Sequence, residues 1–404
     1  MSEAQFDVLI VGAGMAGAAL ALALSESNLR LGLIEARTIN KDIIEVGIGS
    51  LESYSSRVSA ITPASQALLE SLGVWESICK KRVSPFRAME IWDAEGSGNI
   101  EFCSEEISAP LLGHIVENSV INSALLDAVA RHGRVEFFSP VELVGLDEGD
   151  RGITINLKDG RKLSTSLLVA ADGALSKVRT LAGFKTREWD YGHQALVATV
   201  QTEFDPSMTA RQSFITSGPL AFLPLCSAGN KHFCSIVWSA TPELSDELYN
   251  LEEDEFCRRL ERAFESRLGV IKAISKRSTF PLRQRHARDY IKPGIALVAD
   301  AAHTIHPLAG QGINIGLQDV RVLAMELLKA HKREQPLGSI EVLKRYQRQR
   351  KGDNLLMMAA MDCFKLLFEQ NALPVRLLRN LGIDKLSGIP VIKRKIMRYA
   401  MGAD

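Results

Sequence analysis

The sequence predicts an α/β protein in which a discontinuous, Rossmann-like dinucleotide-binding domain carries an inserted, mostly antiparallel β-sheet domain and C-terminal helices. Three observations lead to this architecture. A strand, a glycine-rich turn and a helix follow one another over residues 6–24. Short strand-like segments alternate over residues 190–280, and from about residue 315 the pattern is helical to the end. A chain of 404 residues fits roughly two to three domains.

Charge and cysteine content restrict the classes of function. The 48 Lys and Arg residues equal the 48 Asp and Glu residues, so the chain lacks the basic surplus that a general nucleic-acid binder needs. Six cysteines occur without a C-x-x-C pair, which indicates isolated thiols in a reduced, intracellular protein. The apolar stretch Val8–Leu24 follows Glu3 and Asp7 instead of a basic segment. We therefore expect a soluble, cytoplasmic chain without a signal peptide or a membrane span.

The first motif lies in "FDVLIVGAGMAGAALALALSES". Phe6–Val11 is a short apolar run typical of a strand buried on both faces, and Gly12, Gly14 and Gly17 form G-x-G-x-x-G. Gly12 permits the turn, Gly14 leaves room for a pyrophosphate, and Gly17 lets helix and strand pack closely. Glu35 follows at the end of a second strand, where its carboxylate can accept hydrogen bonds from ribose hydroxyls. The motif predicts a dinucleotide site and leaves NAD and FAD open.

The middle of the chain continues in alternating elements. Residues 56–78 are expected to form a loop entering a helix, and residues 111–133 a short strand followed by a second helix. Residues 135–173 are typical of a β-meander that ends in a buried strand. Within the strand-like region we expect one helix, over roughly 251–268. The strand at 294–303 then returns to the first domain.

This order of elements predicts that a sheet domain interrupts the dinucleotide domain. A cleft between the inserted sheet and the cofactor would be a usual place for a small-molecule site. The expected boundaries are 1–75, 100–182 and 281–345 for the dinucleotide-binding domain, 76–99 and 183–280 for the substrate domain, and 346–404 for the C-terminal helical region.

Three segments together resemble a known family. They are the glycine motif at 12–17, "AADGALSKVR" at 170–179 and "ADAAHTIHPLAGQGINIG" at 299–316. In this order they resemble the FAD-dependent aromatic hydroxylases of the p-hydroxybenzoate hydroxylase class, over nearly the whole chain. The likeness is closest to the ubiquinone-biosynthesis hydroxylases that oxidise a polyprenylated phenol or benzoquinol ring. One position departs from the family, which usually has Gly where this chain has Ala299, and the extra methyl group could crowd the cofactor.

The resemblance implies FAD as the cofactor and places its cradle at residues 299–316. Asp300 is expected to bind ribitol hydroxyls, and Pro307 to form a rigid turn beside the isoalloxazine ring. The helix that begins near Ile313 would point its free N–H groups at the pyrimidine edge, where reduced flavin carries negative charge. Arg57 matches the family arginine near the phosphates. The full predicted cofactor set is Gly12, Gly14, Gly17, Glu35, Arg57, Asn118, Asp172, Asp300, Pro307, Gly310, Gln311, Gly312, Ile313 and Asn314.

Two histidines, His303 and His306, stand in the same segment. Their spacing could mimic half of a metal site, but apart from Asp300 no acidic or Cys partner lies at ligand spacing, so no metal is predicted. His303 is expected to be structural. The predicted catalytic residues are His306 and Pro307, with His306 either a proton carrier or a wall of the pocket.

The resemblance also implies the chemistry. NAD(P)H would reduce FAD, O2 would give a flavin hydroperoxide, and its distal oxygen would pass to the phenol ring. The segments "LAFLPL" and "SIVWS" are candidate pocket walls or, equally, core strands. The alternatives are a flavoprotein halogenase or prenyl reductase on the same scaffold, or a non-catalytic flavin-binding subunit of a quinone-biosynthesis complex. The halogenase pattern W-x-W-x-I-P is absent from the sequence.

The C-terminal segment 371–404 holds seven Lys or Arg residues against two Asp, interleaved with Leu, Ile and Met. A basic, apolar helix suits an anionic lipid surface, from which a water-insoluble polyprenyl substrate would be collected. We therefore expect either a peripheral contact with the inner membrane or a partner protein of a quinone-biosynthesis complex. The alternative is a terminal helix packed on the core.

Overall fold

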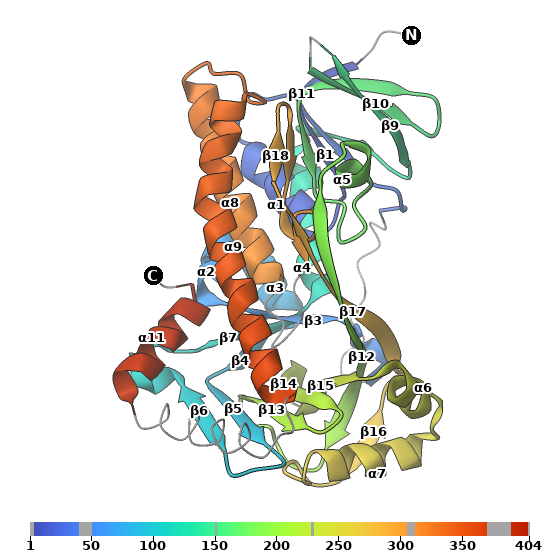
Figure 1. Cartoon of the computed structure of the whole chain (residues 1–404), viewed down its shortest axis with the longest axis vertical. Coiled ribbons are helices and arrows are strands. Elements are labelled where there is room, and N and C mark those ends of the chain that lie inside the picture. The colour runs from blue at the N-terminus through green and yellow to red at the C-terminus, as the bar shows by residue number, and fades with distance from the viewer. Residues whose placement is uncertain are drawn as a thin grey trace.

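The structure is a computed structural model that describes residues 4–39, 51–149, 152–227, 230–304, 312–369 and 389–402 (Figure 1). It confirms the predicted α/β class, with two large sheets and a small third one. Within the described residues, no helix combines the length and the apolar character needed to cross a membrane.

The first large sheet is the dinucleotide-binding sheet predicted from the glycine motif. Its path runs in the order β18-β19-β11-β1-β2-β8, and the four pairings from β19 to β8 are parallel. The central strands are apolar on both faces because helices cover the sheet. The strands of this sheet are β1 (Ala4–Val11), β2 (Leu31–Ile34), β8 (Val135–Phe138), β9 (Leu143–Gly149), β10 (Gly152–Leu157), β11 (Lys162–Ala170), β18 (Ile291–Lys292) and β19 (Ile295–Leu297).

Four helices form the helical layer of this domain. They are α1 (Met15–Leu24), α4 (Asn118–His132), α8 (Gly312–Lys332) and α9 (Ile340–Glu369). The first of them, α1, is almost wholly buried because small and apolar side chains surround its axis, and it packs against α4 and α8. The long α9 packs on α8 and runs down the molecule toward the second sheet (Figure 1).

The second large sheet corresponds to the predicted inserted domain and is mostly antiparallel, with one parallel pairing between β13 and β5. Two paired strands of this sheet, β12 and β17, extend from beside the first sheet into the second (Figure 1). The strands of this sheet are β5 (Ala88–Asp93), β6 (Asn99–Cys103), β12 (Thr186–Thr202), β13 (Thr209–Ile215), β14 (Gly218–Ser227), β15 (Asn230–Ala240), β16 (Ile271–Ile274), β17 (Ser278–Ala287) and β20 (His303–Thr304).

The helix expected over roughly 251–268 is present as α7 (Glu253–Ala263), but two other local elements were missed. A further helix, α6 (Pro242–Asn250), precedes α7; Thr241 caps its proline-started first turn, and the extended backbone at Leu251 separates the two helices. The loop expected before the first internal helix contains a strand, β3 (Val58–Ile61), which pairs with β7 (Gly113–Glu117). That pairing is a tertiary contact, so local sequence does not reveal it.

The small third sheet has the order β3-β7-β4, where β4 is Ser84–Phe86. The predicted domain boundaries stay a proposal, although the pairings favour one shift. A boundary between residues 99 and 100 would cut β6, which pairs with β5 along its whole length. The remaining short elements are α2 (Pro63–Ser71), α3 (Trp75–Lys81), α5 (Lys177–Leu181), α11 (Pro390–Ala400), η1 (Leu51–Ser53), η2 (Ser104–Ile107) and η3 (Ala299–Ala301).

Candidate active site

The three motif glycines shape the turn between β1 and α1. Gly12 has a positive φ of 102°, and a Cβ there would lie 2.4 Å from the carbonyl oxygen of Ala171. A Cβ on Gly17 would lie 1.9 Å from the carbonyl oxygen of Gly12. Gly14 differs, because a Cβ there would meet nothing within 4 Å. Protein packing therefore requires glycine at two of the three positions, while the third faces open space at the start of α1.

A cavity of about 930 Å³ opens in front of this turn. It lies beyond the carboxyl ends of β1, β2 and β11, the place where doubly wound sheets bind ligands. Of the predicted cofactor residues, the cavity wall includes Gly12, Gly14, Glu35, Arg57 and Asp172. The structure thus brings together three segments that are far apart in the sequence.

Glu35 stands directly after β2 and is fixed by two backbone donors. The Ala13 N–H donates to Glu35 Oε2 at 2.9 Å, and the Arg37 N–H donates to Oε1 at 2.9 Å. The carboxylate therefore sits against the glycine turn, where the adenosine end of a dinucleotide would place its ribose.

Replacing Glu35 with Ala is expected to weaken FAD binding by about 1–3 kcal/mol, because the ribose hydroxyls lose their acceptor. Titration of apoprotein with FAD, followed by quenching of flavin fluorescence, measures the change. Glu136→Ala on β8 is the matched control, since Glu136 forms a surface ion pair with Arg30 and does not line the cavity. Equal FAD affinity in the Glu35 variant and the control would contradict the assignment.

Two buried acceptors in the cavity wall have no hydrogen-bond partner among the described residues. They are Asp172 Oδ1 and Asn122 Oδ1. The other Asp172 oxygen accepts from the Val178 N–H at 3.2 Å, and burial raises the pKa of this carboxyl. Such orphaned acceptors fit a ligand that carries hydroxyl donors, as the ribose and ribitol of FAD do. The glycine cradle and these acceptors together fit FAD.

Sequence reasoning missed Asn122 and named Asn118 instead. Asn118 is the first residue of α4, and its Oδ1 accepts from the Ser59 hydroxyl at 2.6 Å. Asn122 lies one helical turn later and reaches the cavity. The spacing i, i+4 on one helix face is the signal that could have identified it. A cofactor role for Asn118 stays a prediction.

Arg57 is exposed on the cavity wall, immediately before β3. Its guanidinium lies 4.9 Å from the centre of the Phe280 ring on β17, a cation–π contact with the second sheet. The residue therefore lies where the two sheets meet, with its charge available to a phosphate.

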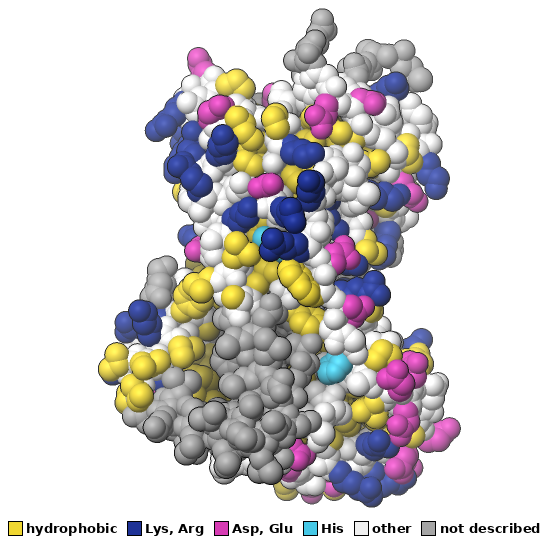
Figure 2. Space-filling view, in the orientation of Figure 1, with side chains coloured by type: hydrophobic (Ala, Val, Ile, Leu, Met, Phe, Trp, Pro, Cys, Tyr) yellow, Lys and Arg dark blue, Asp and Glu magenta, His cyan; other side chains and the backbone are white. Residues whose placement is uncertain are grey.

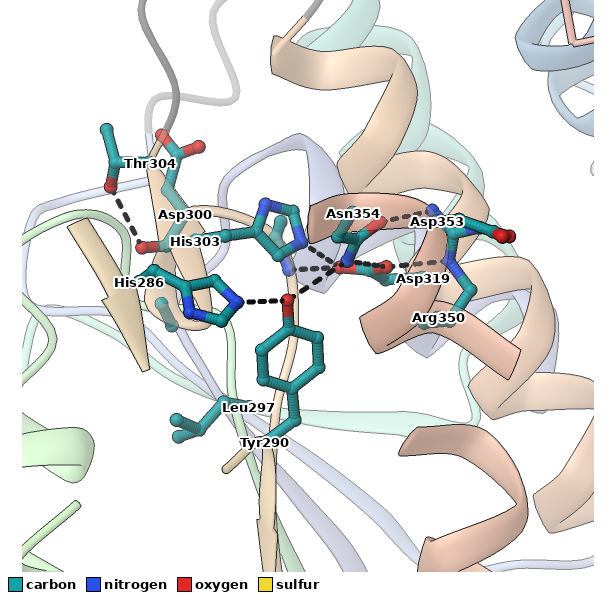
Figure 3. A network of polar contacts seen from close by, with 12 residues as sticks. His286, Tyr290, Leu297, Asp300, His303, Thr304, Asp319, Arg350, Asp353 and Asn354 are labelled. Atoms are coloured by element: carbon teal, nitrogen blue, oxygen red, sulfur yellow. Dashed lines mark hydrogen bonds and ion pairs between the residues drawn. The ribbon is translucent and has the colours of Figure 1, made fainter. Parts of the chain in front are cut away.

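The segment that carries Asp300 is a short 3-10 turn, η3. Asp300 is exposed, and Figure 3 shows its carboxylate pointing away from the buried network beneath the turn. Arg179 braces the two cofactor segments, because its guanidinium donates to the carbonyls of Ala301 at 2.9 Å and Ala174 at 2.7 Å. His303 is buried and its Nε2 lies 2.5 Å from Asp319 Oδ2, which agrees with the structural role expected for it.

Ala299 has the left-handed φ of 52°, a conformation that favours the glycine usual in the family. A Cβ on Gly316 of α8 would lie 2.7 Å from the Ala299 Cβ. The departure at Ala299 thus affects the packing of the turn against α8.

Gly316→Ala is expected to destabilise the protein by about 1–3 kcal/mol, the usual effect of overpacking. Ala299→Gly removes the clashing Cβ, so the double variant should regain most of this loss. By itself Ala299→Gly should leave the fold intact, since relief of about 1–2 kcal/mol of left-handed strain is offset by about 0.8 kcal/mol for the lost methyl group. Chemical denaturation of the four proteins checks this, and a double variant no more stable than Gly316→Ala would exclude the contact as the cause.

The start of α8 is at Gly312, close to the helix start predicted at Ile313 and Asn314. The Asn314 side chain accepts from the Thr62 N–H at 3.1 Å and donates to the Ala60 carbonyl at 2.7 Å, so it ties α8 to β3. The contacts of Gly312, Ile313 and Asn314 with a cofactor stay predictions. The predicted residues His306, Pro307, Gly310 and Gln311 lie outside the described residues, and their roles also stay predictions.

Comparison with known proteins identifies the family. A family model described as an FAD binding domain matches residues 5–354. The chain is 38% identical over 402 residues to 3-demethoxyubiquinol 3-hydroxylase of Escherichia coli (strain K12), with 100% of both chains covered. The chain belongs to the FAD-dependent monooxygenases. FAD is therefore its cofactor, which confirms the prediction made from the three motifs.

Further similarities support this membership. The monooxygenase chain is 34% identical to the ubiquinone biosynthesis monooxygenase COQ6, mitochondrial, of Xenopus tropicalis, over 98% of this chain and 93% of that one. Its fold is similar to the crystal structure of pqsL, a probable FAD-dependent monooxygenase from Pseudomonas aeruginosa, with a TM-score of 0.78 and 22% identity over 94% of this chain and 100% of the other.

Proposed function

We propose that this monooxygenase hydroxylates the aromatic ring of a polyprenylated phenol or quinol intermediate of ubiquinone biosynthesis, with NAD(P)H as electron donor and O2 as co-substrate. The observation that carries the proposal is the likeness to the 3-demethoxyubiquinol 3-hydroxylase over the full length of both chains. A likeness that includes the inserted sheet extends to the part of the molecule that would bind the substrate, not only to the cofactor domain.

The chain's own residues would hold the cofactor and exclude water. The N-terminus of α1 faces the cavity with free N–H groups for the pyrophosphate, Glu35 accepts from the adenosine ribose, and Asp300 accepts from the ribitol. Bound FAD supplies the electron transfer from NAD(P)H and the activation of O2. The protein contributes position and a dry environment for the ring that is oxidised.

The inner face of the second sheet offers an apolar wall beside Arg57. There Ala195, Val197 and Leu282 form a buried cluster, and Val237 and Phe280 pack against it. Side chains of the two candidate wall segments alternate between the two faces of the second sheet. In "LAFLPL" of β14, Leu220 and Phe222 pack with the helices of the inserted domain, while Leu223 and Leu225 belong to the cluster on the other side. Each segment thus forms both core and inner face, and the inner face is the proposed wall of the ring pocket.

The proposal is tested with the purified holoenzyme. NAD(P)H oxidation should be stimulated by a short-tailed prenylphenol, with one oxygen atom from O2 appearing in the product by mass spectrometry. In a strain lacking the gene, the unhydroxylated precursor should accumulate and disappear on complementation. Absence of stimulated NAD(P)H oxidation, together with a quinone profile unchanged by deletion, would contradict a hydroxylase and favour the non-catalytic flavin-binding alternative. Halide-dependent product formation, or reduction of a prenyl chain, would favour the other two alternatives.

We also propose that the described part of the C-terminal segment contacts an anionic lipid surface. One face of α11 is docked on the protein, because Met397 and Met401 are buried and Lys393 pairs with Glu106 at 2.7 Å. The remaining faces hold exposed apolar and basic side chains next to one another, and Figure 2 shows both kinds at the place where Figure 1 draws α11. This arrangement suits the boundary between headgroups and acyl chains. Residues 370–388 lie outside the described residues.

A further inference from the structure

We infer that Asp319 is a positioning residue for the cofactor: it holds the left-handed turn that presents Asp300, acting through the Ala299 amide and through His303. The inference rests on the proposal that Asp300 binds the ribitol. Asp319 lies on α8 and is fully buried, so it contacts no ligand itself.

One oxygen of the Asp319 carboxylate contacts residues on both sides of Asp300. Oδ2 accepts from the Ala299 N–H at 3.1 Å and lies 2.5 Å from His303 Nε2. These two partners flank Asp300 in the chain, and Figure 3 shows Asp300 on the opposite side of the turn from Asp319. A shift of this carboxylate would therefore move Asp300 relative to the cavity.

The other oxygen is held by α9. Oδ1 accepts from Arg350 Nε at 2.8 Å and from Asn354 Nδ2 at 3.1 Å. Burial alone would raise the pKa of Asp319, but His303 and Arg350 hold it below its ordinary value, so the group carries its negative charge. Each oxygen thus has two partners, and the carboxylate is fixed between the turn and a long helix.

The turn needs such a clamp because its backbone is strained. The φ of 52° at Ala299 is unfavourable for a residue with a Cβ, and strain of this kind persists only where the surroundings enforce it. The buried acceptor of Asp319 enforces it by taking up the amide of the strained residue. An Asn at position 319 has only one oxygen, so it would set an amide donor against the Ala299 N–H and His303, or against Arg350.

The decisive experiment compares FAD affinity with stability in matched variants of the full chain. His303→Leu removes a partner of Oδ2 on the turn, and Asn354→Leu removes a partner of Oδ1 on α9, so each removes one bond to the same carboxylate. Unfolding of each apoprotein is followed by circular dichroism, and FAD binding is measured at a temperature where all variants are folded. We expect Asp319→Asn and His303→Leu to weaken FAD binding by roughly tenfold or more, and Asn354→Leu by about threefold or less, at comparable losses of stability.

A second arm adds Ala299→Gly, which relieves the strain of the left-handed conformation that Asp319 enforces. In the Asp319→Asn protein, Ala299→Gly should raise FAD affinity several fold. In the wild-type protein, the same change should raise FAD affinity by about twofold or less. If Asp319 serves only the fold, FAD affinity should fall in proportion to the unfolding temperature in all variants. Ala299→Gly should then also change FAD affinity by the same factor in the wild-type and the Asp319→Asn proteins. Either result would overturn the inference.

Asp300→Ala separates the inference from the proposal beneath it. If Asp300→Ala leaves FAD affinity unchanged while Asp319→Asn lowers it, the ribitol assignment fails and the route through Asp300 fails with it. If Asp300→Ala weakens binding and Asp319→Asn does not, the cofactor assignment stands and only the role of Asp319 is refuted.

Discussion

Gly17→Ala is expected to lower both the stability of the protein and its FAD affinity, whereas Gly14→Ala is expected to lower FAD affinity alone. A Cβ at Gly17 would lie 1.9 Å from the Gly12 carbonyl oxygen, and neither backbone can move without separating α1 from β1. We expect a loss of about 3 kcal/mol or more in the free energy of unfolding, the upper end of overpacking effects. Urea denaturation of the apoprotein measures this loss.

Gly14→Ala tests the cofactor separately from the fold. The position has an ordinary φ of −71° and open space around it, so the free energy of unfolding should change by about 1 kcal/mol or less. The methyl group would occupy space that the pyrophosphate needs, and FAD affinity should fall by roughly two orders of magnitude. A stable Gly14→Ala protein that retains wild-type FAD affinity would show that the phosphates do not pass this point.

Local chemistry is the reason that the cofactor turn could be predicted from the sequence. The roles of Gly12, Gly17 and Glu35 depend on residues within one β-strand–turn–helix unit and on the strand that follows it. These roles can be recognised in the sequence. A dinucleotide site typically has glycines at fixed spacing after a strand and an acidic residue at the end of the next strand. The same reasoning located Ala299 as an unusual residue, but its backbone conformation became visible only in the structure.

The clamp around Asp319 could not be predicted for the opposite reason. Its partners Ala299, Arg350 and Asn354 are 20 to 35 residues away, and only the packing of α8 against α9 brings them together. A single Asp is a weak signal in a helix that also contains other charged residues, because the sequence does not show that this one is buried. The strand β3 was missed in the same way, since its partner β7 lies more than 50 residues later.

The second large effect is expected at the lipid surface. Arg394, Lys395 and Arg398 of α11 are exposed, and α11 contains no acidic residue. Each cation near an anionic bilayer contributes about 1 kcal/mol, so replacing all three with Gln should weaken binding to anionic vesicles by about 3 kcal/mol, roughly 100-fold. Co-flotation with vesicles of phosphatidylglycerol and phosphatidylcholine measures this loss of binding. Raising the salt concentration should also weaken the binding of the wild-type protein to these anionic vesicles.

The arrangement of α11 allows its charge and its apolar contact to be tested without undocking the helix. Ile392, Ile396 and Tyr399 are exposed at helical spacing, with 46%, 37% and 39% of their surface accessible, while the docked face depends on other side chains. Ile392→Asn with Ile396→Asn should reduce binding to neutral as well as anionic vesicles, because lipid charge does not set the apolar part of the free energy. The matched control replaces three exposed cations on or directly after α8, Arg321, Lys332 and Arg333, with Gln. If that control loses as much binding as the α11 variant, or if neither loses any, the contact does not lie on α11; if FAD is lost instead, α11 serves the fold and not the membrane.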